Sequence, residues 1–161
     1  MKVELLMKNE STRLKSIRLA ALQSDPNSFD TTYDQALKWE DDSWERQVQN
    51  LPTWVAVEEE TDGDVGMVRL GQDNQDPKIG WLISMWVSPR ARRKGVAKKL
   101  ILELINYAKS QGLRKIKLDV GDHNQDAAAL YEKMGFKRNG KTTTLSPPRE
   151  HISEHQRVLS L

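Results

Sequence analysis

Residues 78 to 100 read KIGWLISMWVSPRARRKGVAKKL, and this stretch decides the fold. Its first ten residues are almost wholly apolar, which is typical of a central strand buried on both faces. A turn with basic side chains and Gly95 follows, and from Ala97 to Ser110 the apolar residues repeat at helical spacing. Residues 114–120, RKIKLDV, then alternate apolar and polar side chains, as a strand with one buried face does. The order strand, turn, helix, strand predicts a βαβ unit with two parallel strands.

Upstream of this unit the sequence predicts helices followed by a hairpin. Apolar residues recur at helical spacing in residues 11–24 and again in about residues 32–50. Residues 53–59 and 64–70 are short β-type runs joined by a turn that contains Gly63. We therefore expect two helices before any strand, and we expect these early strands to lie at the edges of the sheet.

Downstream, Gln111-Gly112 indicates a left-handed end to the crossover helix. A further helix begins after Asn124, whose side chain can cap it, and ends at Gly135. Residues 136–161 contain two β-type runs around the loop SPPR. Because hairpin-like runs flank the βαβ unit, we expect a mixed sheet. No repeat or linker divides the chain, so residues 1–161 are expected to form a single domain.

The composition is that of a soluble globular protein, with 161 residues, 37% hydrophobic and 30% charged. A net charge of +2 is too small to indicate a polyanion partner. The absence of cysteine excludes disulfides and cysteine nucleophiles, and we expect a reducing, cytoplasmic location. No stretch approaches the roughly 18 apolar residues of a membrane span, and the amino terminus does not read as a signal peptide, so we expect no membrane association.

The basic glycine turn predicts an anion site. A turn that opens a helix presents unpaired backbone N–H groups at the positive end of the helix dipole. Gly95 and the small Ala97 allow a phosphate to approach the main chain. The basic side chains around them are Arg92, Arg93, Lys94 and Lys98. The turn matches neither the P-loop nor the dinucleotide fingerprint, and a pyrophosphate fits it better than an extended nucleic-acid backbone does.

Two other interpretations of the basic turn remain. Nucleic-acid binding predicts further basic and aromatic residues along a shared groove, but the other charged runs, such as EDDSWE and VEEETDGD, are acidic or mixed. We therefore expect no nucleic-acid partner. The second interpretation is that the turn binds nothing and is simply the solvated, basic start of a helix.

Two motifs resemble those of the GCN5-related N-acetyltransferases, the GNAT family. The first is Val87-Ser88-Pro89 followed by residues 92–97, RRKGVA, at the predicted junction of strand and helix. The second is residues 124–136, NQDAAALYEKMGF, at the predicted junction of helix and strand. The resemblance covers most of the chain and is weakest over the last 20 residues. It implies an α/β (α+β) fold with a mixed twisted sheet, central parallel strands 4 and 5 that splay apart, and helices on both faces.

The resemblance also implies acetyl-CoA as co-substrate, no metal, and an amine as acceptor. Tyr131 matches the family's general acid beside the CoA sulfur, although its spacing alone also fits a core aromatic. Asn124 matches a residue that faces the pantetheine arm. The residues that the resemblance implies for CoA binding are Met85, Trp86, Val87, Arg92, Arg93, Lys94, Gly95, Val96, Ala97, Lys98, Asn124, Ala127 and Tyr131.

The general base is not identified by the resemblance. Many family members place a glutamate on strand four, but here that strand reads Ile-Ser-Met-Trp at residues 83–86 and offers no carboxylate. Either ordered water carries the proton away, or a carboxylate from elsewhere, such as Asp119 or Glu154, reaches the site.

The acceptor is equally open. Phe29, Tyr33 and Ser84 are candidate acceptor-binding residues, and Trp39 and Trp44 are aromatic wall candidates that fit a core equally well. The acceptor amine belongs to a small molecule, a peptide amino terminus or a lysine. The alternative is an acetyl-CoA-binding sensor or regulatory module with little turnover. His151 and His155 lack a third ligand, so no metal site is expected, and the sequence leaves a homodimer open.

Overall fold

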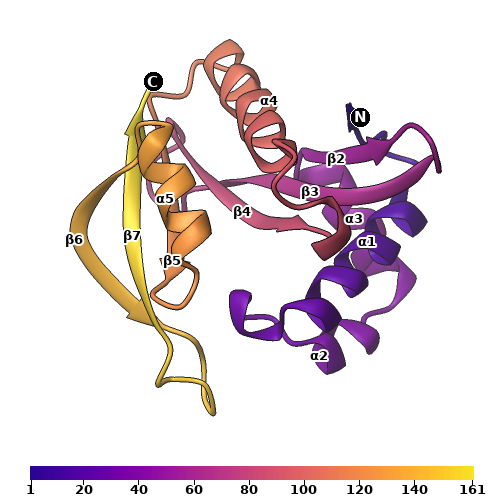
Figure 1. The fold of residues 1–161 in the computed structure, drawn as a ribbon, viewed down its shortest axis with the longest axis horizontal. Helices are drawn as coiled ribbons and strands as arrows, with labels where there is room; N and C mark the ends of the chain where they lie inside the picture. Colours follow the sequence, from indigo (N-terminus) through magenta and orange to yellow (C-terminus); the bar gives the residue numbers. More distant parts are fainter.

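The computed structural model describes residues 1–161, whose strands form one seven-stranded sheet in the order β1-β2-β3-β4-β5-β7-β6 (Figure 1). The strands are β1 (Lys2–Leu5), β2 (Thr53–Glu58), β3 (Gly63–Gln72), β4 (Ile79–Val87), β5 (Lys115–Gly121), β6 (Lys137–Thr144) and β7 (Ser153–Ser160). The helices are α1 (Ser11–Ser24), α2 (Tyr33–Leu37), α3 (Asp41–Asn50), α4 (Val96–Ser110) and α5 (Gln125–Lys133), with 3₁₀ turns η1 (Pro26–Ser28) and η2 (Pro89–Ala91). All neighbouring strands are antiparallel except β4 and β5, so the expected mixed sheet is confirmed.

The parallel strands β4 and β5 splay apart, as expected. They pair only where Ile79–Trp81 lies beside Lys115–Lys117. Beyond these residues β4 continues along β3, whereas β5 pairs with β7 over its whole length. The sheet therefore opens between the ends of β4 and β5, and Figure 1 shows the two halves of the sheet diverging from this point.

Helix α4 makes the crossover between these strands. Gly95 precedes it in a left-handed conformation (φ 79°), which glycine adopts without strain. One face of the helix is buried in the core through Val96, Leu100, Ile101, Leu104, Ile105 and Ala108. Gly112, with φ 75°, follows its end and confirms the predicted left-handed stop.

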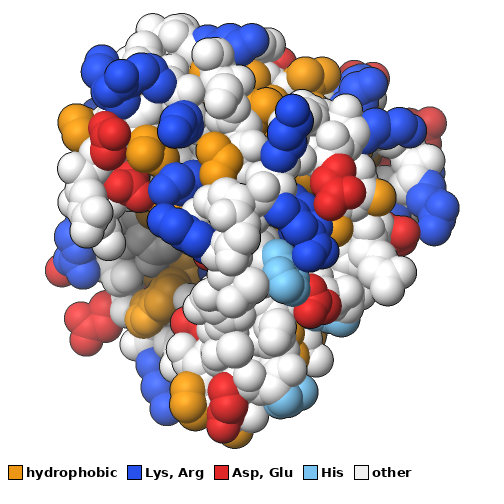
Figure 2. All heavy atoms as spheres, turned by 90° about the vertical axis from the view of Figure 1, so that its left-hand side faces the viewer, with side chains coloured by type: hydrophobic (Ala, Val, Ile, Leu, Met, Phe, Trp, Pro, Cys, Tyr) orange, Lys and Arg blue, Asp and Glu red, His pale blue; other side chains and the backbone are white.

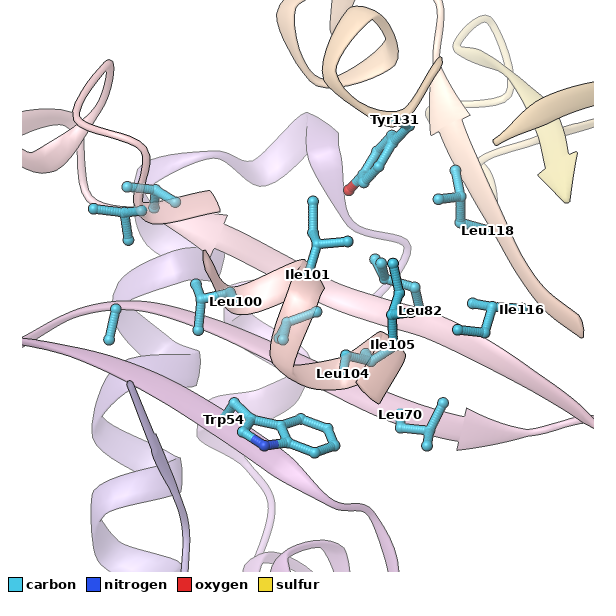
Figure 3. Close-up of a cluster of buried hydrophobic side chains, with 14 of the residues drawn as sticks. Trp54, Leu70, Leu82, Leu100, Ile101, Leu104, Ile105, Ile116, Leu118 and Tyr131 are labelled. Atoms are coloured by element: carbon cyan, nitrogen blue, oxygen red, sulfur yellow. The ribbon is translucent and has the colours of Figure 1, made fainter. Parts of the chain in front are cut away.

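The core lies in two layers, one on each face of the sheet. Along β2, Trp54 and Ala56 join the layer under α4 and α5, while Val55 and Val57 join the layer under α1, α2 and α3. This division follows from the two-residue period of a strand. Figure 3 shows the first layer, where side chains of α4 pack against those of the central strands. Helices therefore cover both faces of the sheet. None of the helices has the length and apolar character of a membrane span.

Three predictions about the amino-terminal part were wrong. A strand, β1, precedes the helices and pairs with β2, so β2 is not an edge. The edges are β1 and the late strand β6. The helical stretch predicted for residues 32–50 is two helices, because Glu40 is extended (ψ 166°) and α3 begins after it.

Two further predictions about local structure also need correction. The strand β4 alternates between buried and half-buried side chains, rather than being buried on both faces, because one face meets the opening beside β5. Asn124 precedes α5, but its side chain makes no capping hydrogen bond.

Candidate active site

The turn before α4 presents a row of free backbone donors. The backbone N–H groups of residues 93 to 98 donate no hydrogen bond within the chain. Arg93 (φ 61°) and Gly95 both have positive φ, which turns the chain sharply into the helix. A Cβ added at Gly95 would meet no atom within 4 Å, so the space in front of the helix is open. These groups and the positive end of the helix dipole form an anion site.

A cavity of about 400 Å³ adjoins these donors and extends towards α5. Its lining residues are Val87, Ala91, Arg92, Arg93, Gly95, Val96, Ala97, Lys98, Leu130, Lys133 and Met134. Figure 2 shows Lys and Arg side chains gathered beside a hollow on the face that carries α5, β6 and β7.

Arg92 holds the turn against the rest of the protein. Its Nε donates to the Val87 carbonyl at 2.9 Å, and its Nη2 lies 2.9 Å from Asp25 Oδ2. The same carboxylate oxygen accepts a hydrogen bond from Trp86 Nε1 at 2.7 Å. Asp25 thus ties the end of α1 to β4 and the turn. The remaining basic groups, Arg93, Lys94 and Lys98, make at most the long, exposed contact of Arg93 with Asp126 at 3.6 Å.

A second cavity, of about 330 Å³, lies where β4 and β5 diverge. It is lined by residues from α1, β3, β4, β5, α5 and β7, from η1 and the loop after it, and from the segment between β5 and α5. The lining residues are Arg18, Ser28, Phe29, Asp30, Thr31, Arg69, Trp81, Leu82, Ile83, Ser84, Met85, Asp119, Val120, Gly121, His123, Asn124, Tyr131 and Glu154.

Tyr131 belongs both to the core and to this second cavity. Its side chain is 5% exposed, and its ring packs edge-on against Phe136 at 5.8 Å between centroids. Figure 3 shows the ring pointing from α5 into the opening between β4 and β5, on the side of Ile101. Burial raises the pKa of the phenol, so the hydroxyl stays protonated in neutral solution and remains a donor.

Three carboxylates line the same cavity: Asp30, Asp119 and Glu154. Burial, followed by the negative charges of Asp119 and Asp30, raises the pKa of Glu154 to about 7, against the opposing effect of Arg149. Burial also raises the pKa of Asp119. A carboxyl with a pKa near 7 exchanges protons readily at neutral pH, which is the property required of a general base.

A bulge interrupts β4 beside the cavity. Ser84 has a positive φ of 56°, and its Oγ accepts a hydrogen bond from Arg69 Nε at 3.0 Å. The register with β3 passes from Ile83 to Trp86, and β5 pairing has ended before this point. Met85 therefore has no register partner on either neighbouring strand.

The structure brings most of the predicted residues to these two cavities. Phe29, Ser84, Met85, Asn124 and Tyr131 line the second one. Four predicted residues line neither cavity: Tyr33, Trp86, Lys94 and Ala127. Trp86 is buried in the layer below α1, and Trp39 and Trp44 pack on each other there at 5.2 Å.

Sequence reasoning missed Arg18, Arg69 and Asp30. One signal was present for Arg18, which is four residues from Leu14 and four from Leu22 on the apolar face of α1. A charged residue at such a position has to be buried or to line a cavity. Arg69 lies between two buried residues of β3, and no local pattern marks Asp30.

Comparisons with known proteins agree with this geometry. Residues 16–136 match the profile of the Acetyltransferase (GNAT) family. The chain is 36% identical over 90 residues to human N-acetyltransferase 8 and 35% identical over 86 residues to mycothiol acetyltransferase of Amycolatopsis mediterranei. These matches cover 55% and 53% of this chain, but only 40% and 26% of the relatives, so the chain spans less than half of their length.

The fold is also shared with solved structures. A GNAT-family acetyltransferase from Streptococcus pneumoniae has a TM-score of 0.82, with 19% identity and 99% of each chain covered. The splayed strands, the glycine turn before α4 and the motif on α5 lie inside or beside the region that the family profile matches. The chain belongs to the GNAT family of acetyltransferases.

Proposed function

We propose that this protein transfers the acetyl group of acetyl-CoA directly to a primary amine. The proposal rests on three features along β4 and its neighbours: the free N–H groups before α4, the opening between β4 and β5, and Tyr131 within that opening. The free N–H groups suit the CoA pyrophosphate, and the opening suits the extended pantetheine arm. The Tyr131 hydroxyl suits a donor to the CoA sulfur.

The phosphates would bind at the turn before α4. Backbone N–H groups of residues 93–98 donate to them, and Arg93, Lys94 and Lys98 add positive charge. Arg92 supports this site by holding the turn through Val87 and Asp25. Residues 85–87 of β4 lie beyond the last pair with β5, and Met85 has no register partner on β3 either, so main-chain groups of this segment would meet the pantetheine amides.

The transfer forms one bond and breaks another. The amine nitrogen attacks the thioester carbon, the new carbon–nitrogen bond forms, and the carbon–sulfur bond breaks with its electron pair going to sulfur. The amine's surplus proton passes to Glu154, directly or through water, with Asp119 beside it. The Tyr131 hydroxyl donates a hydrogen bond to the departing sulfur, and the thiolate then takes a proton from solvent and leaves as the free thiol. The backbone N–H of Met85 would stabilise the oxyanion, since Met85 has no register partner.

Glu154 and Asp119 favour turnover over an acetyl-CoA sensor. The absence of a carboxylate on β4 was the reason for considering a sensor, and both residues now lie in the cavity that holds Tyr131. A carboxyl with a pKa of about 7 in that cavity suits proton transfer, which a sensor does not require.

The test is an amine panel with acetyl-CoA, read by release of free thiol. We expect thiol release that depends on both the amine and acetyl-CoA, and we expect a Glu154→Gln variant to slow it. Thermal stabilisation by acetyl-CoA without thiol release from any amine would support the sensor instead. No stabilisation and no thiol release would contradict both assignments.

A further inference from the structure

The second cavity separates positive from negative charge across the opening between β4 and β5. Its basic side chains, Arg18 and Arg69, come from α1 and β3, on the β4 side of the opening. Asp119 and Glu154 come from β5 and β7, on the other side. The third carboxylate, Asp30, follows η1 in the chain, but it accepts hydrogen bonds from Ser146 and its charge acts on Glu154, so it belongs to the acidic end. A molecule that spans the cavity therefore meets cations at one end and carboxylates at the other.

Arg18 is a buried cation without a counter-ion. It is 5% exposed, and its Nε and Nη1 are buried with no hydrogen-bond partner. Its guanidinium makes a cation–π contact with the Phe29 ring, whose centroid lies 4.9 Å from the guanidinium carbon. Burial and the neighbouring charge of Arg69 lower the pKa of Arg18 to about 9, which still leaves it charged at neutral pH. The guanidinium has lost its hydration and gained no anion.

Arg69 adds a second buried positive charge that has no anionic partner. It is also 5% exposed, and it donates to two neutral acceptors, Ser84 Oγ at 3.0 Å and Gln47 Oε1 at 2.9 Å. It forms no ion pair, and burial lowers its pKa to about 10. Two neighbouring buried guanidinium groups are unfavourable unless an anion binds between or beside them. A planar guanidinium is suited to the two oxygens of a carboxylate.

We propose that the acceptor is a small amino acid, whose carboxylate binds Arg18 and Arg69 while its amine faces Asp119 and Glu154. The inference rests on the proposed function for the reaction, but the binding itself does not need turnover. The cavity of about 330 Å³ is near the lower end of the range for small-molecule sites. A protein amino terminus or an internal lysine carries no carboxylate beside its amine, so neither would neutralise the arginine pair.

The first experiment compares the protein amino acids, β-alanine and γ-aminobutyrate with the carboxamide of each, using acetyl-CoA and thiol release. Loss of a hydrogen-bonded charge predicts that the best free acid exceeds its own carboxamide by about 10- to 100-fold in kcat/KM. Phosphoethanolamine is included, because a phosphate would also suit the arginine pair. If carboxamides or decarboxylated amines react as fast as the free acids, the inference is wrong while the proposed acetyl transfer stands.

The second experiment uses Arg18→Met, which keeps the apolar stem and removes the charge. Replacing an unpaired buried cation with an apolar side chain is often neutral or stabilising, so we expect the free variant to melt at the same or a higher temperature than wild type. Its kcat/KM for the free acid should fall to that of the carboxamide, which should itself change little. Arg18→Lys should retain part of the preference, and Arg138→Met on exposed β6 is the control.

A binding measurement tests the amino-acid site independently of acetyl transfer. Thermal shift is measured with the best amino acid, its carboxamide and sulfate, for wild type and Arg18→Met. If no amine releases thiol, an amino-acid shift that disappears in Arg18→Met still supports the site while the proposed function fails. Equal shifts with sulfate would indicate an unselective anion site and overturn the proposal, and so would the absence of any amino-acid shift.

Discussion

At the level of single residues, Tyr131 fits both interpretations that its sequence position allowed, a core aromatic and a residue of the proposed active site. Its ring is part of the core, packed on Phe136, while its hydroxyl lies in the opening beside β4. Because its pKa is raised, full transfer of its proton to sulfur would be uphill, so the contribution that we propose for it is a hydrogen bond to the departing thiolate.

Tyr131→Phe tests that contribution, since it keeps the ring and removes only the hydroxyl. We expect acetyl-CoA affinity and melting temperature to change little, while the single-turnover rate falls by about 10²- to 10³-fold, as when one donor to a developing anion is removed. Tyr107→Phe is the matched control, because Tyr107 packs edge-on against Trp54 at 5.2 Å and lines neither cavity. If Tyr131→Phe keeps more than half of the single-turnover rate, another group assists the sulfur.

Glu154 should determine the pH dependence of the reaction. A base with a pKa of about 7 is active only when deprotonated, so the single-turnover rate should rise with pH through a midpoint near 7. Glu154→Gln should be slow and lack this midpoint, whereas Asp119→Asn should lower it by removing a negative neighbour. A wild-type profile that Glu154→Gln leaves unchanged would exclude Glu154 as the base.

The same residue predicts a stability difference. Its pKa is raised from 4.5 in an unfolded reference to about 7 in the folded protein, so the folded state favours the protonated carboxyl. The wild type should therefore lose stability relative to Glu154→Gln as pH rises from about 4.5 through 7, and the difference should be constant above that range. Denaturant midpoints at several pH values measure it, and equal curves would contradict the raised pKa.

At the level of secondary structure, the amino-terminal end of α4 is the feature on which the proposed binding of acetyl-CoA depends. Acetyl-CoA at a concentration of 100 times its Kd should stabilise the folded wild type by about 2.7 kcal/mol and raise its melting temperature. Gly95→Glu should abolish this shift in melting temperature. The new carboxylate repels phosphate from the free N–H groups. Gly140→Glu is a close control, since Gly140 also has positive φ (85°) and open space around its Cα. Equal acetyl-CoA shifts in the two variants would refute the phosphate site.

The contact between α1 and the turn is a second element-scale feature. Asp25→Ala leaves the Trp86 indole N–H without an acceptor and releases Arg92 from one of its partners. We expect a loss of about 1–2 kcal/mol in unfolding free energy, at the low end because Arg92 is half exposed, together with weaker acetyl-CoA binding. Asp25→Asn, which keeps an acceptor, should be milder in both measurements.

At the scale of the whole molecule, the two ends of the chain close the second cavity together. Arg149, in the loop between β6 and β7, donates to the carbonyls of Pro26, Phe29 and Asp30, and Ser146 donates to the Asp30 carboxylate. These contacts join residues more than a hundred positions apart and position both Phe29 and Asp30 at the cavity.

Arg149→Ala should therefore raise KM for the acceptor while leaving acetyl-CoA affinity unchanged, because the phosphate site lies on the other side of the opening. Arg138→Ala, on exposed β6, is the control. An equal loss of acetyl-CoA binding in Arg149→Ala would mean that the loop supports the fold as a whole rather than the acceptor cavity.

The sequence by itself determined the features that depend on neighbours along the chain. The βαβ unit follows from hydrophobic period, the start and end of α4 follow from Gly95 and Gly112, and the family resemblance follows from contiguous motifs. It did not predict β1, since four residues of mixed polarity become a strand only by pairing with β2.

The cavity between β4 and β5 is visible only in the tertiary structure. Arg18, Asp30, Arg69 and Glu154 come from α1, a loop, β3 and β7, and each looks locally like an ordinary surface charge or an exception to an apolar pattern. The two arginines are buried, Glu154 is half-buried and Asp30 is exposed, and they come together because β4 and β5 part after Trp81 and leave a space that their elements border. The same surroundings raise the pKa of Glu154. Local propensity carries no information about such a space, because it is created by the pairing of strands distant in the chain.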